Sequence, residues 1–121
     1  MIVINKSFQP EEPPQSTPKY QPGQLVAHKR YRYRGVVVSA DSYCRADPVW
    51  YHSNKTQPDR AQPWYHVLVH GGGSCTYAAE TSLEPDTSRE PVEHPLVIVF
   101  FSGFEQGQHI RNDEPWPEQP T

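Results

Sequence analysis

The chain has 121 residues, including 14 prolines, and its formal net charge is −3 at pH 7. The length fits one domain, and the scattered prolines argue against long helices because each one fixes φ and removes a backbone donor. The weak net charge argues against a dedicated high-affinity DNA-binding protein, which usually carries a large positive excess.

Charge and proline are unevenly distributed along the chain. Residues 22–83 carry seven Lys or Arg and four Asp or Glu, whereas residues 84–121 carry two and eight. Both ends are polar and rich in proline, a composition that buries too little apolar surface to fold alone. We therefore predict three segments: a Pro-rich extension over 1–21, a folded domain over 22–104 and an acidic Pro-rich tail over 105–121.

The sequence gives only weak indications of the cell compartment and of the role of the N-terminal segment. The N-terminus lacks the basic and apolar regions of a secretory signal, and the run PLVIVFF is too short to span a bilayer. We therefore expect a soluble cytoplasmic protein without membrane contact, in which Cys44 and Cys75 are thiols or form a disulfide. Pro10 and Pro13 have the PxxP spacing that SH3 and WW domains recognise, although such matches are common in tails.

The first half of the predicted domain contains two strands and a long loop. Segments 24–28 and 34–40 are rich in β-branched residues, and a short connection at 29–32 separates them. Gly35, at the start of the second strand, indicates a bulge or a close backbone approach. The polar stretch 41–62 predicts a loop, and a loop of this length is either functional or poorly ordered.

The second half contains a hairpin and a further apolar segment. Residues 64–70 alternate between two strand faces, with Trp64, His66, Leu68 and His70 on one and Tyr65, Val67 and Val69 on the other. GGGS then reads as a turn and 75–83 as the return strand. Segment 94–104 is an apolar strand or a short buried helix. The sum is a mainly β domain of about five antiparallel strands, most simply a small SH3-like barrel.

Cations and tyrosines alternate between the first two strands, at Lys29, Arg30, Tyr31, Arg32, Tyr33 and Arg34. In an extended chain the three arginines project to one side at about 6.6–6.8 Å spacing, which suits a phosphate backbone. Four phosphate contacts would lower affinity roughly a hundredfold between about 50 and 200 mM salt. The alternative is a solvated hairpin face, in which the tyrosines cap a barrel and the arginines protect an edge strand.

Histidines, cysteines and carboxylates form no pattern typical of a metal centre or an active site. His66 and His70 would lie about 13 Å apart on a strand, too far to share one ion. Cys44, His52 and Cys75 show neither CxxC nor helical HxxxH spacing. No nucleophile elbow, phosphate-binding glycine loop or paired-carboxylate motif is present. We therefore expect neither an enzyme nor a bound cofactor.

A series of motifs follows the chain in order. The first are Gly23, Val26, His28, Tyr33, Gly35, Val36 and Val37, followed by Trp50 and Asn54. QPWYHVLV at 62–69 is the most specific block and includes Pro63, Tyr65 and His66. Tyr77, Ala79, Glu80 and Leu83 come next, and His94, Pro95, Leu96, Phe101 and Phe104 end the series. Together these motifs resemble the HspQ/YccV-like family, whose domain is also called the hemimethylated-DNA-binding domain.

The resemblance covers residues 23–104 and implies a small β-barrel without catalytic activity or a required cofactor. It implies one of two binding roles: recognition of hemimethylated DNA, or a heat-shock role in which an adaptor helps a cytosolic ATP-dependent protease degrade its substrates. The Pro-rich extension and the segment beyond Leu83 depart from the short bacterial members. The matched aromatic residues Trp50, Tyr65 and Tyr77 are structural or binding residues.

We therefore expect a non-enzymatic DNA-binding protein, with the protease adaptor as the alternative. The candidate DNA contacts are Lys29, Arg30, Tyr31, Arg32 and Arg34; they rest on charge, because none of the basic residues falls on a matched position. The expected partners are DNA, in particular a hemimethylated duplex, or the protease and its substrates. Self-association through an edge strand is also open.

Overall fold

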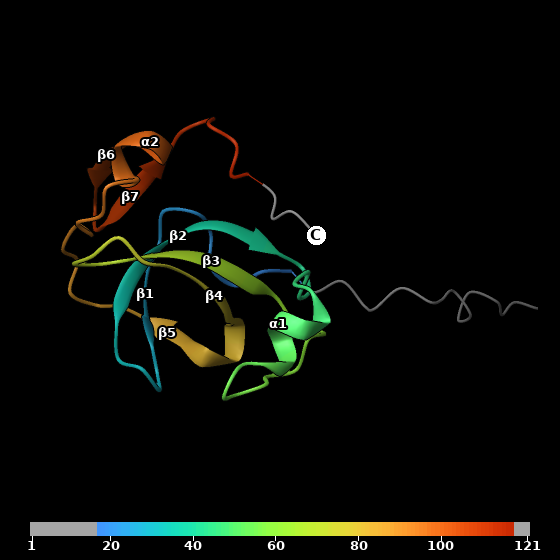
Figure 1. The fold of residues 1–121 in the computed structure, drawn as a ribbon. Coiled ribbons are helices and arrows are strands. Elements are labelled where there is room, and N and C mark those ends of the chain that lie inside the picture. Colours follow the sequence, from blue (N-terminus) through green and yellow to red (C-terminus); the bar gives the residue numbers. More distant parts are fainter. Residues whose placement is uncertain (1–16, 118–121) are drawn as a thin grey trace, which may run out of the picture.

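The structure is a computed structural model in which residues 17–117 are described (Figure 1). The PxxP spacing at Pro10 and Pro13, most of the predicted extension 1–21 and the last four residues of the predicted tail lie outside the described residues.

Five strands form one antiparallel sheet in the order β4-β3-β2-β1-β5. They are β1 (Leu25–His28), β2 (Arg34–Asp41), β3 (Trp64–Val69), β4 (Cys75–Ala79) and β5 (Leu83–Pro85). The short 3-10 helix η2 (Glu80–Ser82) carries the chain from β4 at one edge directly to β5 at the other, so the sheet must curl to bring its edges near each other. The predicted mainly β fold is confirmed. The predicted barrel goes beyond the evidence, because no ladder closes β4 onto β5 in the described part of the chain.

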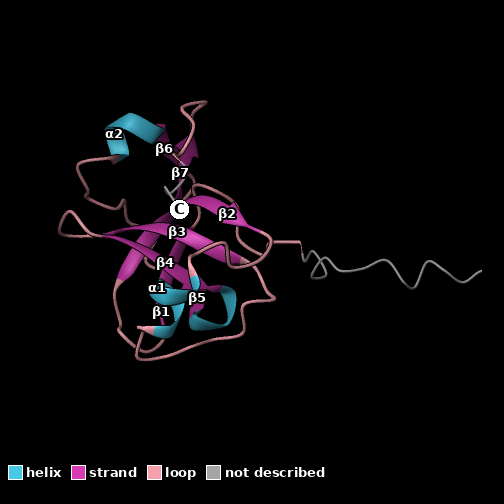
Figure 2. Ribbon diagram, turned by 45° about the vertical axis from the view of Figure 1, so that its right-hand side comes forward, coloured by secondary structure: helices cyan, strands magenta, loops and turns pink. Residues whose placement is uncertain are grey.

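A small second layer covers one face of the sheet. It consists of α2 (Val97–Phe100), β6 (Phe101–Glu105) and β7 (Gln108–Arg111), with β6 and β7 paired as a hairpin. The apolar segment 94–104 therefore contains both a short helix and a strand. The predicted boundary at residue 104 falls inside this hairpin, so β7 lies in the segment assigned to the tail. Figures 1 and 2 show α2 and α1 (Pro48–His52) on opposite sides of the sheet.

Two apolar clusters share the strands of the sheet. The cluster inside the curl contains Tyr20, Val26, Val37, Tyr65, Val67, Ala78 and Leu83. The cluster under the second layer contains Leu25, Val36, Val38, Leu68, Val92, Phe100 and Phe101. Tyr65 and Val67 thus face one cluster and Leu68 the other, so the alternation predicted for this strand is confirmed at these positions.

Gly23 and Gly35 allow close backbone approach between elements. A Cβ on Gly35 would lie 2.5 Å from the carbonyl oxygen of Leu68, which explains the glycine at this position. The bulge in β2 lies further along, between Val37 and Ser39. Gly23 has φ +103°, and a Cβ there would lie 2.2 Å from the carbonyl oxygen of His109 on β7.

Ordered structure also occupies the predicted extension and the predicted loop. Tyr20 is buried in the cluster inside the curl, and its N–H donates to the hydroxyl of Tyr65 at 3.1 Å. The folded unit therefore begins before residue 22. Within 41–62, α1 begins after Asp47, whose carboxylate accepts the N–H of Val49 at 2.8 Å and caps the helix.

Candidate functional site

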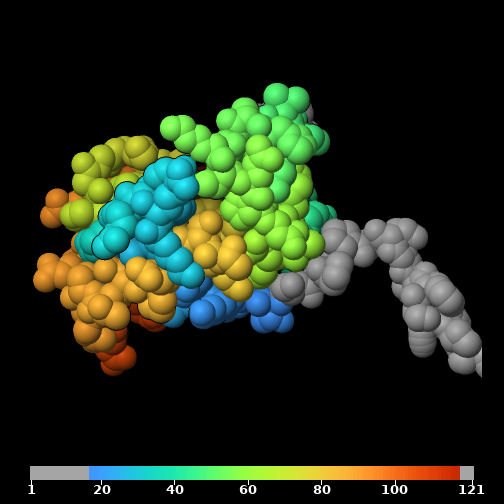
Figure 3. All heavy atoms as spheres, turned by 90° about the horizontal axis from the view of Figure 1, so that it is seen from below, coloured from blue at the N-terminus to red at the C-terminus, as the bar shows by residue number. Residues whose placement is uncertain are grey.

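A groove of about 670 Å³ runs along the free edge of β4, and every residue of β4 lines it. One wall comes from α1 and the residues after it, up to Pro58. The other comes from the β1–β2 connection, with His28, Tyr31 and Tyr33. Figure 3 shows these two walls, in green and cyan, on either side of the yellow-orange residues near position 80. We call this feature the β4 groove.

Aromatic rings form the floor and part of one wall of the β4 groove. The rings of Trp64 and Tyr77 lie 5.3 Å apart, and Trp50 packs edge-on against Tyr77 at 5.8 Å and against Trp64 at 6.3 Å. Trp64 is buried, whereas Trp50 is 38% exposed. The groove therefore presents one partly exposed indole on a packed aromatic base, an arrangement suited to contact with a flat or apolar group.

Local hydrogen bonds hold Trp50 in this position. The side-chain amide of Asn54 donates to the carbonyl oxygen of Trp50 at 2.7 Å, and the hydroxyl of Ser53 donates to the same oxygen at 2.9 Å. These bonds add to the one that the same oxygen accepts from the N–H of Ser53 at 3.2 Å, at the C-terminal end of α1. Asn54 thus has a structural role beside the groove, and it explains why Trp50 and Asn54 occur together.

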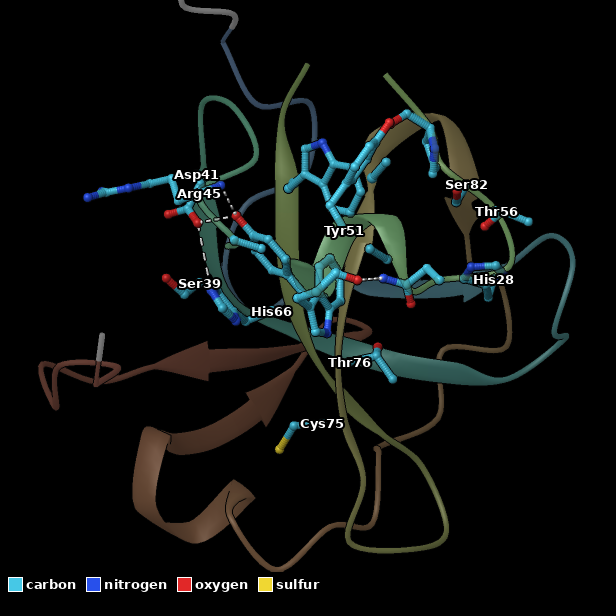
Figure 4. Close-up of a pocket in the computed structure, with 18 of the residues that line it drawn as sticks. His28, Ser39, Asp41, Arg45, Tyr51, Thr56, His66, Cys75, Thr76 and Ser82 are labelled. Carbon is cyan, nitrogen blue, oxygen red and sulfur yellow. Dashed lines mark hydrogen bonds and ion pairs between the residues drawn. The ribbon is translucent and has the colours of Figure 1, made fainter. Parts of the chain in front are cut away.

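Polar groups gather at the opposite end of the groove, around Asp41 (Figure 4). The carboxylate of Asp41 accepts the hydroxyl of Tyr77 at 2.5 Å and lies 3.7 Å from Nε2 of His66. Burial raises the pKa of Asp41, but its contacts with His66 and Tyr77 outweigh burial and leave that pKa below its usual value. Burial and the same carboxylate raise the pKa of Tyr77. Asp41 is therefore a fixed anion near neutral pH.

The cationic run forms a tight turn, which confirms the predicted short connection between two strands. The extended conformation, in which the three arginines would project to one side, does not occur. The N–H of Arg32 donates to the carbonyl oxygen of His28 at 2.9 Å, and Arg32 has φ +64°. Nδ1 of His28 accepts the N–H groups of Arg30 and Tyr31, at 3.1 and 3.0 Å. Burial, with a smaller contribution from Arg30, lowers the pKa of His28, which keeps this nitrogen available as an acceptor. His28 therefore determines the shape of the turn.

The four cations have different surroundings. Lys29, Arg30 and Arg32 are exposed, and we call residues 29–32 the basic turn. Tyr31 is 50% exposed and stacks on His28 at 4.7 Å between ring centroids. Arg34 instead pairs with Asp86 at 3.0 Å and donates to the carbonyl oxygens of Glu90 and Pro91. Arg34 therefore has a structural role, and the structure does not place it with the basic turn.

Comparison with known proteins matches this chain to one family. A family model described as "Hemimethylated DNA-binding protein YccV like" matches residues 18–108. The chain belongs to the YccV-like family. "F-box only protein 21" of Homo sapiens and of Mus musculus are each 35% identical to it over 98 residues, which is 78% of this chain. The chain spans only 15% and 16% of the lengths of these two curated relatives.

The remaining YccV-like motif positions are divided between the groove and the core. His28, Tyr33, His66 and Tyr77 line the groove. Gly23, Gly35, Pro63, Tyr65 and Glu80 instead support the sheet: the hydroxyl of Tyr65 donates to Glu80 at 2.7 Å, and the N–H of Glu80 donates to Pro63 at 2.9 Å. His94 and Pro95 lie beside the second layer, outside the groove lining.

The thiols and histidines of the YccV-like chain do not form a reactive pair. Cys44 is buried and Cys75 exposed, and both are free thiols. Sγ of Cys75 lies 4.0 Å from Nε2 of His94, but Nδ1 of His94 accepts the N–H of Leu96 at 3.0 Å. The hydrogen of this imidazole therefore lies on Nε2, which donates to the carbonyl oxygen of Ser74 at 3.0 Å, so His94 is unsuited to act as a base for Cys75. Within residues 17–117, no three His, Cys, Asp or Glu side chains are grouped to hold a metal ion, and no helix is long and apolar enough to cross a membrane.

Trp116 and Arg45 were not predicted from the sequence as residues of the groove. Trp116 packs against His66 at 5.4 Å and Phe100 at 5.2 Å, and with Pro117 it lines one end of the groove. A single tryptophan among the prolines of a polar tail was the available signal. Arg45 is exposed, lines the groove and donates its N–H to the hydroxyl of Tyr77 at 3.1 Å. An isolated arginine in a long polar stretch gave no signal.

Proposed function

We propose that this chain is a non-enzymatic DNA-binding protein that prefers hemimethylated duplexes and contacts their phosphates through Lys29, Arg30 and Arg32. The supporting observation is that these three cations are exposed on a turn of fixed shape beside an aromatic groove, in a chain of the YccV-like family. Exposed cations suit phosphate contacts, which supply affinity, whereas contacts to base edges supply selectivity.

The salt dependence follows from the number of free cations. Because Arg34 is paired with Asp86, three phosphate contacts replace the four expected from the sequence. Three contacts correspond to a slope of about −2.7 in log affinity against log salt, or about a 40-fold loss between about 50 and 200 mM salt. Binding by the basic turn alone is therefore weak, and selectivity must come from the neighbouring groove.

The groove offers a chemical basis for methyl recognition. A methyl group on a base edge is apolar, and the exposed rings of Trp50 and Tyr31 provide apolar surface next to the cations. Burial of one methyl group contributes about 0.8 kcal/mol, which corresponds to roughly fourfold selectivity. We therefore expect a modest preference for the methylated strand in addition to the phosphate contacts.

The test is a salt titration of duplex binding by the Arg30→Ala/Arg32→Ala double variant, followed by fluorescence anisotropy. Loss of two phosphate contacts should reduce the magnitude of the salt slope by about 1.8 and weaken binding more than tenfold at about 50 mM salt. Arg89→Ala, which removes an exposed cation outside the groove lining, is the matched control and should bind as the unmodified protein does. A folded double variant with an unchanged slope would contradict the proposal.

The adaptor role for a cytosolic ATP-dependent protease remains a prediction, as do the heat-shock context and the cytoplasmic location. The feature that favours a protein contact of any kind is the open edge of β4, and the kind of contact that this edge suits can be argued from its backbone groups.

A further inference from the structure

The two edges of the sheet differ in how they are protected. β5 has only three residues and ends at Pro85, and short strands with proline are a common protection against unwanted pairing. β4 has five residues, pairs with β3 without a register shift and contains neither proline nor lysine. It therefore keeps the features of an edge that accepts another strand.

The register of β4 shows which backbone groups point outward. The N–H of Glu80 donates to Pro63, and the N–H of Val69 donates to Ser74, so these are hydrogen-bonded pairs at the two ends of the ladder. Such pairs alternate along an antiparallel ladder. The backbone N–H and C=O groups of Cys75, Tyr77 and Ala79 therefore point away from β3, toward the free edge.

These outward groups face the β4 groove. All three residues line it. Within residues 17–117, the backbone N–H and C=O groups of Cys75 and Tyr77 have no hydrogen-bond partner, whereas the carbonyl of Ala79 begins the 3-10 helix η2. A row of unpaired donors and acceptors at the spacing of a strand is complementary to another extended backbone. The groove walls come from α1 on one side and the β1–β2 connection on the other.

The charges around the groove indicate which sign of charge the bound chain should carry. Asp47 is used in capping α1, and Asp41 accepts the hydroxyl of Tyr77. Arg45 is exposed and lines the groove, and the exposed cations Lys29, Arg30 and Arg32 flank Tyr31, which also lines it. Both carboxylates keep their charge, but the four cations Lys29, Arg30, Arg32 and Arg45 outnumber them, so the net charge facing a partner is positive.

We propose that the β4 groove binds an extended acidic segment of a partner protein, which adds as a strand to the free edge of β4. Its backbone pairs with Cys75 and Tyr77, alternate side chains pack toward Trp50, and its carboxylates lie near Arg30 and Arg32. This proposal goes beyond DNA binding and does not depend on it. Because both ligands use the basic turn, DNA and the acidic segment compete.

The test uses a fluorescein-labelled synthetic peptide of about eight residues in which Glu and Val alternate, a length within the usual range for strands and sufficient to span the five residues of β4. The full chain should bind it and bind the peptide with Lys in place of Glu at least tenfold more weakly. N-methylation of the alternate amides that pair with β4 should also weaken binding at least tenfold. Equal binding of the N-methylated peptide would overturn strand addition, and equal binding of the Lys peptide would overturn the charge assignment.

Amide hydrogen exchange measured by NMR locates the contact. In the free protein the Cys75 and Tyr77 amides should exchange rapidly, and the Glu–Val peptide should slow both at least tenfold. Protection of these amides without peptide that increases with protein concentration would instead assign the edge to a second copy of the chain. Protection without peptide at all concentrations would show that the edge is already occupied, and it would equally overturn the proposal.

Two variants distinguish loss of pairing at the β4 edge from unfolding and from loss of DNA binding. Cys75→Pro removes one outward donor and no ladder hydrogen bond, so it should weaken peptide binding at least fivefold. The far-UV circular dichroism and the affinity for an unmethylated duplex, which the basic turn supplies, should stay unchanged. Gly72→Ala, in the open turn before β4, is the matched control and should bind normally. Full peptide affinity of folded Cys75→Pro would count against pairing at this edge, whatever the outcome for DNA.

Discussion

The β4 groove and the cluster beneath the α2–β6–β7 layer differ although the same strands contribute to both. The cluster under the second layer is closed over Leu68, Val36 and Val38 by Phe100 and Phe101, and its members are apolar. The β4 groove combines aromatic rings with Asp41, His66 and Arg45, and it is left open beside the basic turn. One part of the sheet is thus covered and stabilises the fold, and another part is uncovered and carries the polar and aromatic side chains available for binding.

This difference separates residues needed for folding from residues needed for binding. Closed apolar contacts should contribute most to the free energy of unfolding, whereas exposed groove residues should contribute to affinity with little effect on stability. The cationic run contains both kinds of residue. Arg34 forms an ion pair with Asp86 and supports the fold, whereas Arg32 is exposed and available for binding.

The largest effect is expected in the closed cluster. Phe101→Ala removes a side chain that is 5% exposed, and we expect a loss of about 3–5 kcal/mol in the free energy of unfolding, measured by urea denaturation. Val49→Ala, at a position that is 76% exposed, should change stability by less than about 0.5 kcal/mol. A loss below about 1 kcal/mol for Phe101→Ala would mean that the second layer does not support the fold.

The next effect concerns the contact between β7 and the start of the domain. Gly23→Ala combines a left-handed backbone with a Cβ placed 2.2 Å from the carbonyl oxygen of His109, so we expect a loss of about 1–3 kcal/mol. The same change at Gly72, where nothing lies within 4 Å, should be nearly neutral in the same urea titration. Similar urea midpoints for Gly23→Ala and Gly72→Ala would show that β7 can shift to accommodate the added Cβ at little cost.

A third effect depends on pH and tests the polar end of the groove. Tyr77→Phe removes the hydroxyl that donates to Asp41, which should cost about 1–3 kcal/mol near pH 7. The folded state lowers the pKa of Asp41, so its stabilisation is present above the usual carboxyl pKa of about 3.9 and is lost as pH falls below it.

The pH dependence can be measured by thermal unfolding between about pH 7 and 2. The variant should lose less stability on acidification than the unmodified protein, because the pKa of Asp41 moves back toward its usual value. Asp41→Asn should remove this part of the pH dependence in both backgrounds. An identical acid profile for Tyr77→Phe and the unmodified protein would contradict the role of this hydrogen bond.

The smallest effect on stability is expected at Trp50, which is partly exposed on α1. Trp50→Ala keeps the carbonyl oxygen that accepts from Asn54, so stability should change by less than about 1 kcal/mol. The preference for a hemimethylated over an unmethylated duplex should fall roughly fourfold, the value of one lost methyl contact. A full preference in this variant would place methyl recognition elsewhere.

Much of the sheet was predictable because its strands carry strong local patterns. The β-branched runs of β1 and β2 and the alternation of β3 indicate their own positions and faces. β7 was missed because Gln108–Arg111 contains one strongly apolar residue, and its main anchor is the buried His109, which accepts the N–H of Val92. Such an anchor depends on a distant partner and leaves no periodic signal.

The candidate site was predictable only in part. The family motifs include Trp50, His66 and Tyr77, which the fold brings together from three elements. The shape of the basic turn was not predictable, because it depends on Nδ1 of His28 accepting two backbone N–H groups. The withdrawal of Arg34 from this turn depends on Asp86, 52 residues away in the chain.

The most direct test of DNA recognition is fluorescence anisotropy of one duplex in unmethylated, hemimethylated and fully methylated forms, at about 50 and 200 mM salt. The proposal predicts binding that weakens about 40-fold over this range, with the hemimethylated form preferred to the unmethylated form at both concentrations. Absence of binding at the lower salt concentration, or equal affinity for all three duplexes at both concentrations, would contradict it.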